Sequence, residues 1–537
     1  ISVQPGTGRI ALVGTDARNE VRFEPKLNGR FLIVKLALAD PSGAAPLIVD
    51  LNPQLDYVAS TLPPSERPKA LGDPRAIAWH PDGSRAFVAG MGSNNVVEID
   101  GSGARIGEPI AVGEGPAGLV VDGARQRLYV WNHFEASLST VDLATRAESA
   151  RLAAFDPLPA AIRAGRPFLY DTHRTSGTGH VSCASCHVDA RMDRLAWDLG
   201  DPRLPVKPFN QNCQTMIGLQ SCQDWHEMKG PMTTQTLQDI IGHEPHHWRG
   251  DREGIEAFNP AFEGLLGDDA LLSPAEMQAF EDFLATITFP PNPFRNFDNS
   301  LPTALPLEGH YTSGRLSMAG LPLGTGNAVR GLDRYVFGLL DPPFPCASCH
   351  TLPPGMAVNG PLLLGALNVA VGGQVRPMGP MGENSLGIVS TDGGTNISIK
   401  TPQLRNLYDK VGFETTQSES LAGFGYFHDG AVDSLARFLS ANVFAVRSDQ
   451  DVADLVALML AFSGSEFPLQ NPPLGAPAPL SKDSHAAVGG QATHAGGAVP
   501  ERALAMLALA RAGKVDLIAR SAAQAWAFDA PSDRFLP

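Results

Sequence analysis

The chain is poor in positive charge and in cysteine, and it contains no long apolar run. Its 537 residues include 41 Lys and Arg against 56 Asp and Glu, which gives a formal net charge of −15. That balance argues against nucleic acid and anionic membrane surfaces as partners, and it allows a basic redox partner protein. No run of 18 or more apolar residues occurs, so we expect no transmembrane segment.

The residues that are abundant point to a loop-rich, multidomain protein. The 55 Gly and 45 Pro favour an architecture with many turns over long helical bundles. A hydrophobic content of 43% is sufficient for large cores, and the length predicts three or four domains.

Four of the six cysteines lie in two copies of one pentapeptide, Cys-Ala-Ser-Cys-His. C-x-x-C-H is the attachment signature of a c-type haem, in which two thiols one turn apart bind the vinyl groups and the histidine becomes the proximal iron ligand. A zinc site or a redox dithiol is the alternative for a single C-x-x-C. Because the motif is duplicated, we expect two covalently bound c-type haems. Their attachment residues are Cys183, Cys186, Cys346 and Cys349, and their proximal ligands are His187 and His350.

The two remaining cysteines, Cys213 and Cys222, are close in the sequence. Covalent haem attachment implies an oxidising compartment, so we expect a disulfide between them, with two buried free thiols as the alternative. The chain starts at Ile1 without a signal-peptide pattern, from which we infer that a leader has been removed. The expected location is periplasmic or extracellular.

Residues 1–171 are expected to form β-structure. Residues 74–100 return at 116–142, an offset of 42, and a third, degenerate copy is expected at 159–170. A period of about 40–45 residues with several short strands per unit is typical of propeller blades. About four blades fit before Cys183, so either the N-terminus is truncated or other segments complete the ring.

The two haem segments repeat each other beyond the pentapeptide. A similar segment follows each pentapeptide, at 228–237 and at 399–407, and each segment is followed by a turn that ends in glycine. Apolar residues at helical spacing predict a closing helix in each half, at 274–284 and at 452–462. Two tandem cytochrome c domains explain this duplication.

The predicted fold class is therefore multidomain β plus α. An N-terminal β-propeller, complete or incomplete, precedes two tandem, mainly α-helical cytochrome c domains. The predicted domains are 1–171 (propeller-like repeats), 172–300 (first cytochrome c domain), 301–470 (second cytochrome c domain), 471–500 (a linker rich in Pro, Gly and Ala) and 501–537 (a C-terminal helix and strand).

With both halves aligned, residues 172–470 resemble the bacterial dihaem cytochrome c peroxidase superfamily, which includes the enzyme that matures methylamine dehydrogenase. The resemblance is carried by the two C-A-S-C-H motifs, by Lys-Thr-Pro-Gln-Leu-Arg-Asn at 400–406 and by Tyr-Phe-His-Asp-Gly at 426–430. Residues 60–170 resemble lactonase-like (YVTN-type) propeller repeats. The peroxidase resemblance implies one haem that meets hydrogen peroxide and another that relays electrons.

The residue on the second face of each iron sets its potential and reactivity. For haem 1 we favour His247, which lies 60 residues after His187, close to where small cytochromes place their distal ligand. For haem 2 the resemblance places His428 near the haem, as a ligand or beside it. Residues 440–445 lack the methionine or tyrosine that the family supplies there. The other candidates are His226, His243, His246, Met228 and Met232 for haem 1, and Met378, Met381 or an open site for haem 2.

Cleavage of peroxide needs a group that moves a proton between its two oxygens. The peroxidases place a glutamate after an Asn-Pro, and residues 259–263 (Asn-Pro-Ala-Phe-Glu) match in part, so Glu263 is the acid–base candidate. A solvated carboxylate at a helix end is the alternative. Trp197, Trp225 and Trp248 are candidates for electron relay or for core packing. The peroxidases also hold calcium between their domains, but no acidic loop with calcium-type spacing occurs here.

Three functions are compatible with these features. The first is a dihaem peroxidase or peroxide-dependent oxidase whose propeller docks a donor or substrate protein. The second is a non-enzymatic electron carrier with two six-coordinate haems, which the histidine-rich stretch 243–247 favours. The third is a structural role, with the haems as cores of a large extracellular assembly.

Overall fold

The computed structural model forms two compact units. The first comprises residues 1–207, 225–241 and 254–287, and the second comprises 208–224, 242–253 and 288–537. The residues described are 1–22, 27, 29–57, 62–203, 205, 215–216, 219–220, 230–244, 246–248, 252–342, 344–348, 350–356, 387–389, 398–410, 425–464, 467 and 481–537. In these ranges no helix is both long enough and apolar enough to cross a bilayer.

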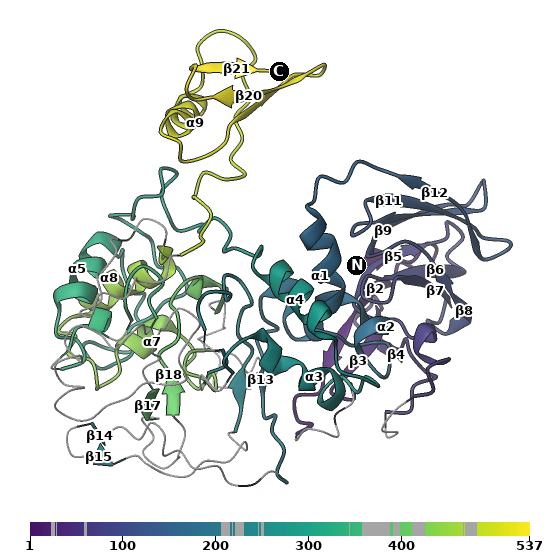
Figure 1. Ribbon diagram of the computed structural model, residues 1–537, viewed down its shortest axis with the longest axis horizontal. Helices are drawn as coiled ribbons and strands as arrows, with labels where there is room; N and C mark the ends of the chain where they lie inside the picture. Colours follow the sequence, from purple (N-terminus) through teal and green to yellow (C-terminus); the bar gives the residue numbers. More distant parts are fainter. Residues whose placement is uncertain are drawn as a thin grey trace. The chain divides into compact units, whose positions relative to one another are not determined.

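Three antiparallel four-stranded sheets, each built from consecutive strands, open the chain (Figure 1). This sheet-rich start is propeller-like, and we call the sheets the first, second and third blade. The first contains β1 (Ser2–Val3), β2 (Ile10–Ala17), β3 (Leu32–Ala39) and β4 (Leu47–Asp50). The second contains β5 (Pro74–Trp79), β6 (Arg85–Gly90), β7 (Asn95–Asp100) and β8 (Arg105–Ala111). The third contains β9 (Pro116–Asp122), β10 (Arg127–Asn132), β11 (Ser137–Asp142) and β12 (Ala147–Ala153).

The expected degenerate repeat at 159–170 is wrong, because this segment is the helix α1 (Ala160–Tyr170). Gly165, Phe168 and Leu169 are its buried residues, and their spacing of three and four positions marks one helical face. Three blades therefore precede Cys183 among the described residues, where the sequence suggested about four. Closed propellers have four to eight blades, and the strands of the described ranges form no closed ring.

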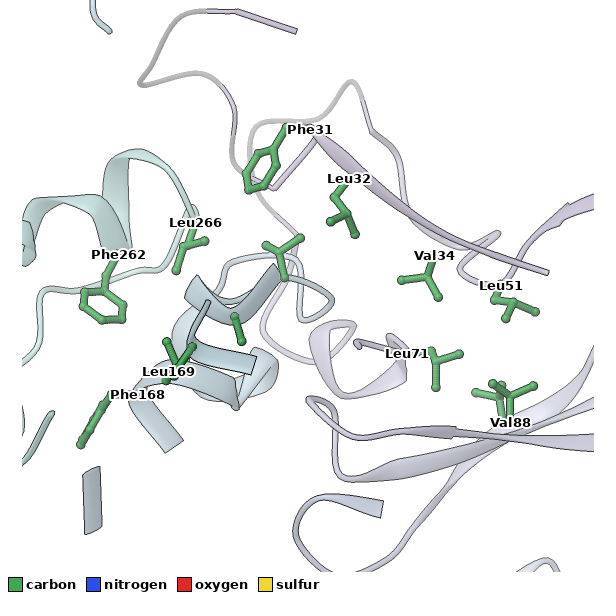
Figure 2. Packing of buried hydrophobic residues seen from close by; sticks show 14 of the residues in the cluster. Phe31, Leu32, Val34, Leu51, Leu71, Val88, Phe168, Leu169, Phe262 and Leu266 are labelled. Carbon is green, nitrogen blue, oxygen red and sulfur yellow. The ribbon is translucent and has the colours of Figure 1, made fainter. Parts of the chain in front are cut away.

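The first and second blades and the segment with the first C-x-x-C-H motif share one hydrophobic core (Figure 2). In β3, Leu32, Val34 and the alternate residues after them point inward, and they pack in the same cluster as Phe168 of α1 and Phe262. His180 Nε2 lies 2.9 Å from the carbonyl oxygen of Leu32, which ties the chain just before Cys183 to the first blade. The first unit thus joins propeller-like sheets and the first C-x-x-C-H motif.

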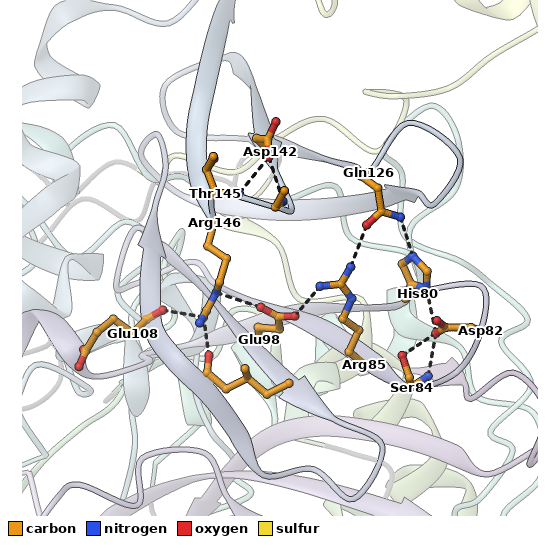
Figure 3. A network of polar contacts seen from close by, with 12 residues as sticks. His80, Asp82, Ser84, Arg85, Glu98, Glu108, Gln126, Asp142, Thr145 and Arg146 are labelled. Carbon is orange, nitrogen blue, oxygen red and sulfur yellow. Dashed lines mark hydrogen bonds and ion pairs between the residues drawn. The ribbon is translucent and has the colours of Figure 1, made fainter.

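A buried carboxylate fastens the second blade to the third (Figure 3). Glu98 in β7 is 3% exposed, and its two carboxylate oxygens each lie 3.0 Å from a guanidinium. One belongs to Arg85 of the same blade and the other to Arg146 in the turn between β11 and β12. The charge of Glu98 is therefore compensated from both blades.

Each C-x-x-C-H motif follows a helix that packs against the last helix of its half. In the first unit α1 packs on α4 (Pro274–Leu284), and in the second α5 (Ala328–Phe337) packs on α8 (Asp449–Leu460). A glycine allows each close approach. A Cβ added at Gly165 would lie 2.0 Å from the carbonyl oxygen of Ala279, and one at Gly331 would lie 2.2 Å from that of Asp454. The duplication seen in the sequence is thus present in the packing.

The remaining α-helices and strands are short, apart from α9. They are α2 (Thr172–Thr175), β13 (Ala196–Trp197), β14 (Thr215–Met216), β15 (Leu219–Gln220), β16 (Met232–Thr233), α3 (Pro260–Gly264), β17 (Gly387–Val389), β18 (Ser398–Lys400), α7 (Leu435–Leu439), α9 (Glu501–Arg511), β19 (Ile518–Arg520), β20 (Ala525–Asp529) and β21 (Arg534–Leu536). Strands β19 to β21 form a separate antiparallel sheet near the C-terminus.

The C-terminal hairpin β20–β21 repeats the hairpin β9–β10. Asp529 pairs with Arg534 as Asp122 pairs with Arg127, across a four-residue turn in both cases. The aspartate also accepts a hydrogen bond from the backbone N–H three residues later, at 3.0 Å in each hairpin. The C-terminal segment is therefore a blade-type hairpin, which the sequence analysis did not identify.

Candidate haem sites

The first motif forms a tight turn at its two cysteines. Residues Cys183–Ser185 form a 3₁₀ turn, in which the Ser182 N–H donates to the Ser185 hydroxyl oxygen and the Ser185 N–H donates to the Ser182 carbonyl oxygen, both at 3.0 Å. The N–H of His187 donates to the carbonyl oxygen of Cys183 at 2.9 Å. Cys183 and Cys186 are half-buried against the core of the first unit.

Both motif histidines are oriented through Nδ1. The Nδ1–H of His187 donates to the carbonyl oxygen of Gln235 at 2.8 Å. The Nδ1 of His350 lies 2.8 Å from the carbonyl oxygen of Gly355 and 3.0 Å from that of Pro402. Since a carbonyl oxygen only accepts, Nδ1 carries the proton and the lone pair is on Nε2. Metal-bound histidines are typically held in this way.

The acceptors Gln235 and Pro402 occupy the same place in the duplicated sequence. They are the second residues of Thr234–Leu237 (Thr-Gln-Thr-Leu) and of Thr401–Leu404 (Thr-Pro-Gln-Leu). The segment that repeats after each motif therefore supplies the backbone carbonyl that orients the histidine.

Burial favours the neutral form of each group in the first motif. It lowers the pKa of His187, and it also lowers the pKa of His350 in the second motif. It raises the pKa of the Cys183 thiol to about 12 and that of Cys186 well above its usual value. A redox dithiol needs an accessible thiolate of low pKa, which this environment disfavours. Within the described part of the chain, no three His, Cys, Asp or Glu side chains are grouped to hold a metal ion by themselves.

Asp193 is a site residue that the sequence analysis missed. Burial raises its pKa, and its carboxylate accepts hydrogen bonds from the Leu195 N–H and from the Trp197 indole N–H at 2.9 and 2.7 Å. Asp193 also interacts with the thiol of Cys186. Trp197 is 5% exposed and packs edge-to-face on Phe31, with ring centres 5.5 Å apart. No motif marks Asp193, since its proximity to the thiol arises only from the loop after His187.

The turns that follow the two repeats have the same backbone geometry. His246 pairs with Arg252 as Tyr426 pairs with Val432, and the residue after each first partner has a positive φ: 66° at His247 and 65° at Phe427. His247 therefore corresponds to Phe427, and Trp248 corresponds to His428. A left-handed backbone is uncommon for residues other than glycine and clusters at functional sites.

The segment with His247 belongs to the second unit, together with His350 and His428, whereas His187 belongs to the first. In this segment His243 and Glu244 are buried, at 6% and 4% exposure. The assignment of His247 to haem 1 stays a prediction. Because His247 belongs to the same unit as His350, haem 2 is the alternative.

Trp248 of the same segment is 7% exposed and packs under a lysine. The Nζ of Lys410 lies 5.0 Å from the centre of the indole ring, and burial lowers the pKa of Lys410 to about 8. Trp248 is thus buried, its role in electron relay stays a prediction, and Lys410 is a second residue that no sequence motif indicated.

The other candidates differ in environment. Glu263 is exposed on the short helix α3, while Phe262 beside it lies in the core. Met232 is 8% exposed, and its strand β16 pairs with β13 at Trp197. His428 is half-buried. Outside the described residues lie Cys213, Cys222, Trp225, His226, Met228, Cys349, Met378 and Met381.

No family model matches the chain, and no curated protein matches it. Among solved structures it is similar to a hydrazine synthase chain from Kuenenia stuttgartiensis, with 29% identity over 16% of this chain and 24% of that chain, at a TM-score of 0.15. A hydrazine synthase structure from the same organism, pressurised with xenon, is 19% identical over 57% of this chain and 89% of that one, at 0.29. AztD from Citrobacter koseri is 20% identical over 24% and 32%, at 0.17. This chain thus spans about a quarter of the first of these structures, and at such TM-scores no family is established.

Proposed function

We propose that this protein is a dihaem c-type cytochrome of the cytochrome c peroxidase type, which reduces hydrogen peroxide or uses it to oxidise a partner protein. In this proposal one haem is catalytic and the other relays electrons. The cofactors are two covalently bound c-type haems, with calcium unsupported by the sequence. The location is periplasmic or extracellular, where covalent haem attachment and disulfides are compatible.

The observation that carries the proposal is the duplicated support of the motif histidines. His187 and His350 each follow a C-x-x-C pair, and each has Nδ1 held by a backbone carbonyl from the same repeated segment. A histidine with a purely structural role would not need its Nδ1 held in the same way in both halves. An iron ligand requires Nε2 to be unprotonated and fixed in direction.

The residues of the chain would hold, orient and insulate the two cofactors. Cys183 and Cys186 would bind the first haem, and Cys346 and Cys349 the second. When bound, each haem supplies an iron that exchanges one electron and can bind a small oxygen compound. The repeated carbonyls fix the imidazoles, and Asp193 holds the indole of Trp197 beside the first motif. Glu263 remains the candidate that moves a proton during peroxide cleavage. That role needs a carboxylate shielded from water, whereas Glu263 is exposed.

A non-enzymatic electron-transfer protein is the second candidate. It is favoured by the buried histidines His243 and His246, at 6% and 7% exposure, on the segment that also carries His247. If these histidines supply distal ligands, both haems are six-coordinate and neither binds peroxide. The propeller-like blades would then serve as a docking or assembly surface.

Electron paramagnetic resonance of the oxidised and half-reduced protein separates the two candidates. The peroxidase proposal predicts a high-spin haem signal in at least one state, and loss of that signal when hydrogen peroxide is added. Low-spin signals alone in both states, with no reaction with peroxide, would contradict the enzymatic role and support the carrier.

A further inference from the structure

An arginine of the second blade contacts the loop that follows the first C-x-x-C-H motif. Arg75 lies on β5, and its Nε and Nη2 donate to the two carboxylate oxygens of Asp73 at 2.9 and 3.1 Å. Its Nη2 and Nη1 also donate to the two carboxylate oxygens of Asp189, at 2.9 and 3.4 Å. Because Asp189 lies two residues after His187, this bidentate contact joins the blade to the chain beside the motif histidine.

The contact can hold the loop although it lies near the surface. The side chain of Asp189 is 61% exposed and that of Arg75 is 26% exposed. Exposed ion pairs contribute little unless their geometry is bidentate or several charges form a network. Both conditions are met here, since Asp73 fixes the guanidinium of Arg75. Asp73 is fixed in turn, because its carbonyl oxygen accepts from the N–H of Met91 at 2.9 Å.

The backbone beside this contact has an uncommon conformation. Asp189 has a φ of 52° and Ala190 a φ of 60°, so two successive residues other than glycine are left-handed. Alanine has no polar side chain that compensates for this conformation, which persists only where the surroundings hold it. Arg75 holds the first of the two residues, and the core of the first unit encloses the second, which is 4% exposed. The conformation of the loop therefore depends on the blade.

The loop supports the segment that orients the motif histidine. The carbonyl oxygen of Ala190 accepts from the N–H of Leu237 at 2.9 Å and from the hydroxyl of Thr236 at 3.4 Å. The preceding residue, Gln235, supplies the carbonyl oxygen that accepts from Nδ1–H of His187 at 2.8 Å. The N–H of Ala190 also donates to the carbonyl oxygen of His187 at 2.9 Å. The direction of the imidazole thus depends on the position of Ala190.

We propose that Arg75 is a positioning residue for the first haem, which fixes the direction of the His187 imidazole through the loop at 189–190. The inference rests on the proposed function, because it requires a haem iron at Nε2 of His187. It gives the second blade a part in the first haem site that is separate from any docking of a partner protein.

The midpoint potential of the first haem reports this support. The Nδ1–H hydrogen bond makes the imidazole of His187 a stronger donor to iron, which favours the oxidised haem and lowers the potential. If the loop relaxes, this hydrogen bond weakens and the potential rises. Charge alone acts differently, since loss of the Arg75 cation lowers the potential and loss of the Asp189 carboxylate raises it. A variant without both charges therefore separates position from charge.

The double variant Arg75→Gln and Asp189→Asn removes the contact and leaves the net charge unchanged. In the full chain with both haems attached, we expect a higher midpoint potential for the first haem in a redox titration. We also expect shifted g-values in its electron paramagnetic resonance signal, because these values depend on the orientation of the imidazole on the iron. The signal of the first haem is the one that is absent from the variant Cys183→Ser and Cys186→Ser.

The matched control is the double variant Arg85→Gln and Glu98→Gln. It removes another ion pair of the same blade, 3.0 Å long, also at constant net charge. This control should lower the stability of the first unit and leave the potential and the g-values of the first haem as in the wild type. An equal shift in both double variants would overturn the proposal, because general loosening of the blade would then explain it.

The remaining outcomes distinguish the inference from the proposed function. Two haems in the variant of Arg75 and Asp189, with the potential and g-values of the wild type, would overturn the inference and leave the haem assignment intact. A wild type without covalent haem would overturn the proposed function itself. If the double variant does not fold, Asp189→Asn alone decides, since it changes an exposed side chain. Unchanged g-values in that single variant would equally overturn the inference, and shifted g-values would support it.

Discussion

The Nδ1–H of His187 donates a hydrogen bond to the backbone carbonyl oxygen of Gln235, 2.8 Å away and 48 residues further along the chain. The same relationship joins His350 to Pro402 at 3.0 Å, across 52 residues. Because donor and acceptor are so distant in the sequence, each hydrogen bond forms only when its half of the duplication is folded. The two halves of the duplication have therefore kept the support of the histidine as well as the pentapeptide.

Replacement of Gly331 by alanine should destabilise the second unit. A Cβ there would lie 2.2 Å from the carbonyl oxygen of Asp454, so α5 and α8 must move apart. We expect a loss of about 2 kcal/mol in the free energy of unfolding, measured by denaturant titration. Gly324→Ala is the control, because a Cβ at Gly324 meets nothing within 4 Å. Equal stability of both variants would contradict the close packing.

Removal of the carboxylate of Glu98 should weaken the joint between the second and third blades. Glu98→Ala leaves Arg85 and Arg146 without their shared partner in a largely buried place, at a cost of about 3 kcal/mol in the free energy of unfolding. Calorimetry should show a lower melting temperature for the first unit. Glu20→Ala breaks an exposed pair with Arg18 and should cost less than about 1 kcal/mol. Similar losses of stability in Glu98→Ala and Glu20→Ala would contradict a stabilising role for the contacts of Glu98 with Arg85 and Arg146.

The second unit should lose stability in acid through Asp454. Burial acts to raise the pKa of this carboxyl, but hydrogen bonds from Arg330, the Asn327 N–H and Gln450 outweigh it, so the pKa lies below its usual 3.8. A carboxyl with a lowered folded pKa stabilises the protein above its unfolded pKa and loses that effect as the pH falls through the folded value. Unfolding should therefore become easier below about pH 4.

Asp454→Asn isolates this contribution to the pH dependence. The variant should be less stable by about 2 kcal/mol at pH 7 and should show a shallower loss of stability in acid. Asp433→Asn is the control, because its pair with Arg437 is partly exposed and should contribute less than about 1 kcal/mol. An unchanged acid slope in Asp454→Asn would contradict the assignment.

Mass spectrometry of the unreduced protein tests the predicted pair Cys213 and Cys222. We expect one disulfide-linked peptide that contains both residues, because an oxidising compartment favours pairing of neighbouring thiols. Alkylation of both as free thiols, without prior reduction, would refute the disulfide and weaken the assignment of the compartment.

The sequence predicted those features that depend on local spacing. The helices at 274–284 and 452–462 follow from apolar residues three and four positions apart, and α4 has these bounds while α8 runs from Asp449 to Leu460. The 42-residue repeat predicted the second and third blades for a similar reason, since each strand and turn recurs at the same offset.

The features that sequence missed depend on contacts between distant residues. The segment 159–170 resembled a third copy of the 42-residue repeat, but α1 forms there because its buried face fits against α4 through Gly165. The buried environments of Asp193 and Lys410 are formed by loops that no short sequence motif predicts. Ligation by His247 and His428 depends on three-dimensional position relative to each iron, which sequence spacing alone does not determine.

The most direct test of the account is a count of covalently bound haems. The protein should be produced in cells that attach c-type haem, and its intact mass and its pyridine haemochrome spectrum should be measured after denaturation. We predict two haems per chain, and one in the variant with Cys183→Ser and Cys186→Ser. A chain without covalent haem, whose motif thiols react freely with alkylating agents, would contradict the central claim.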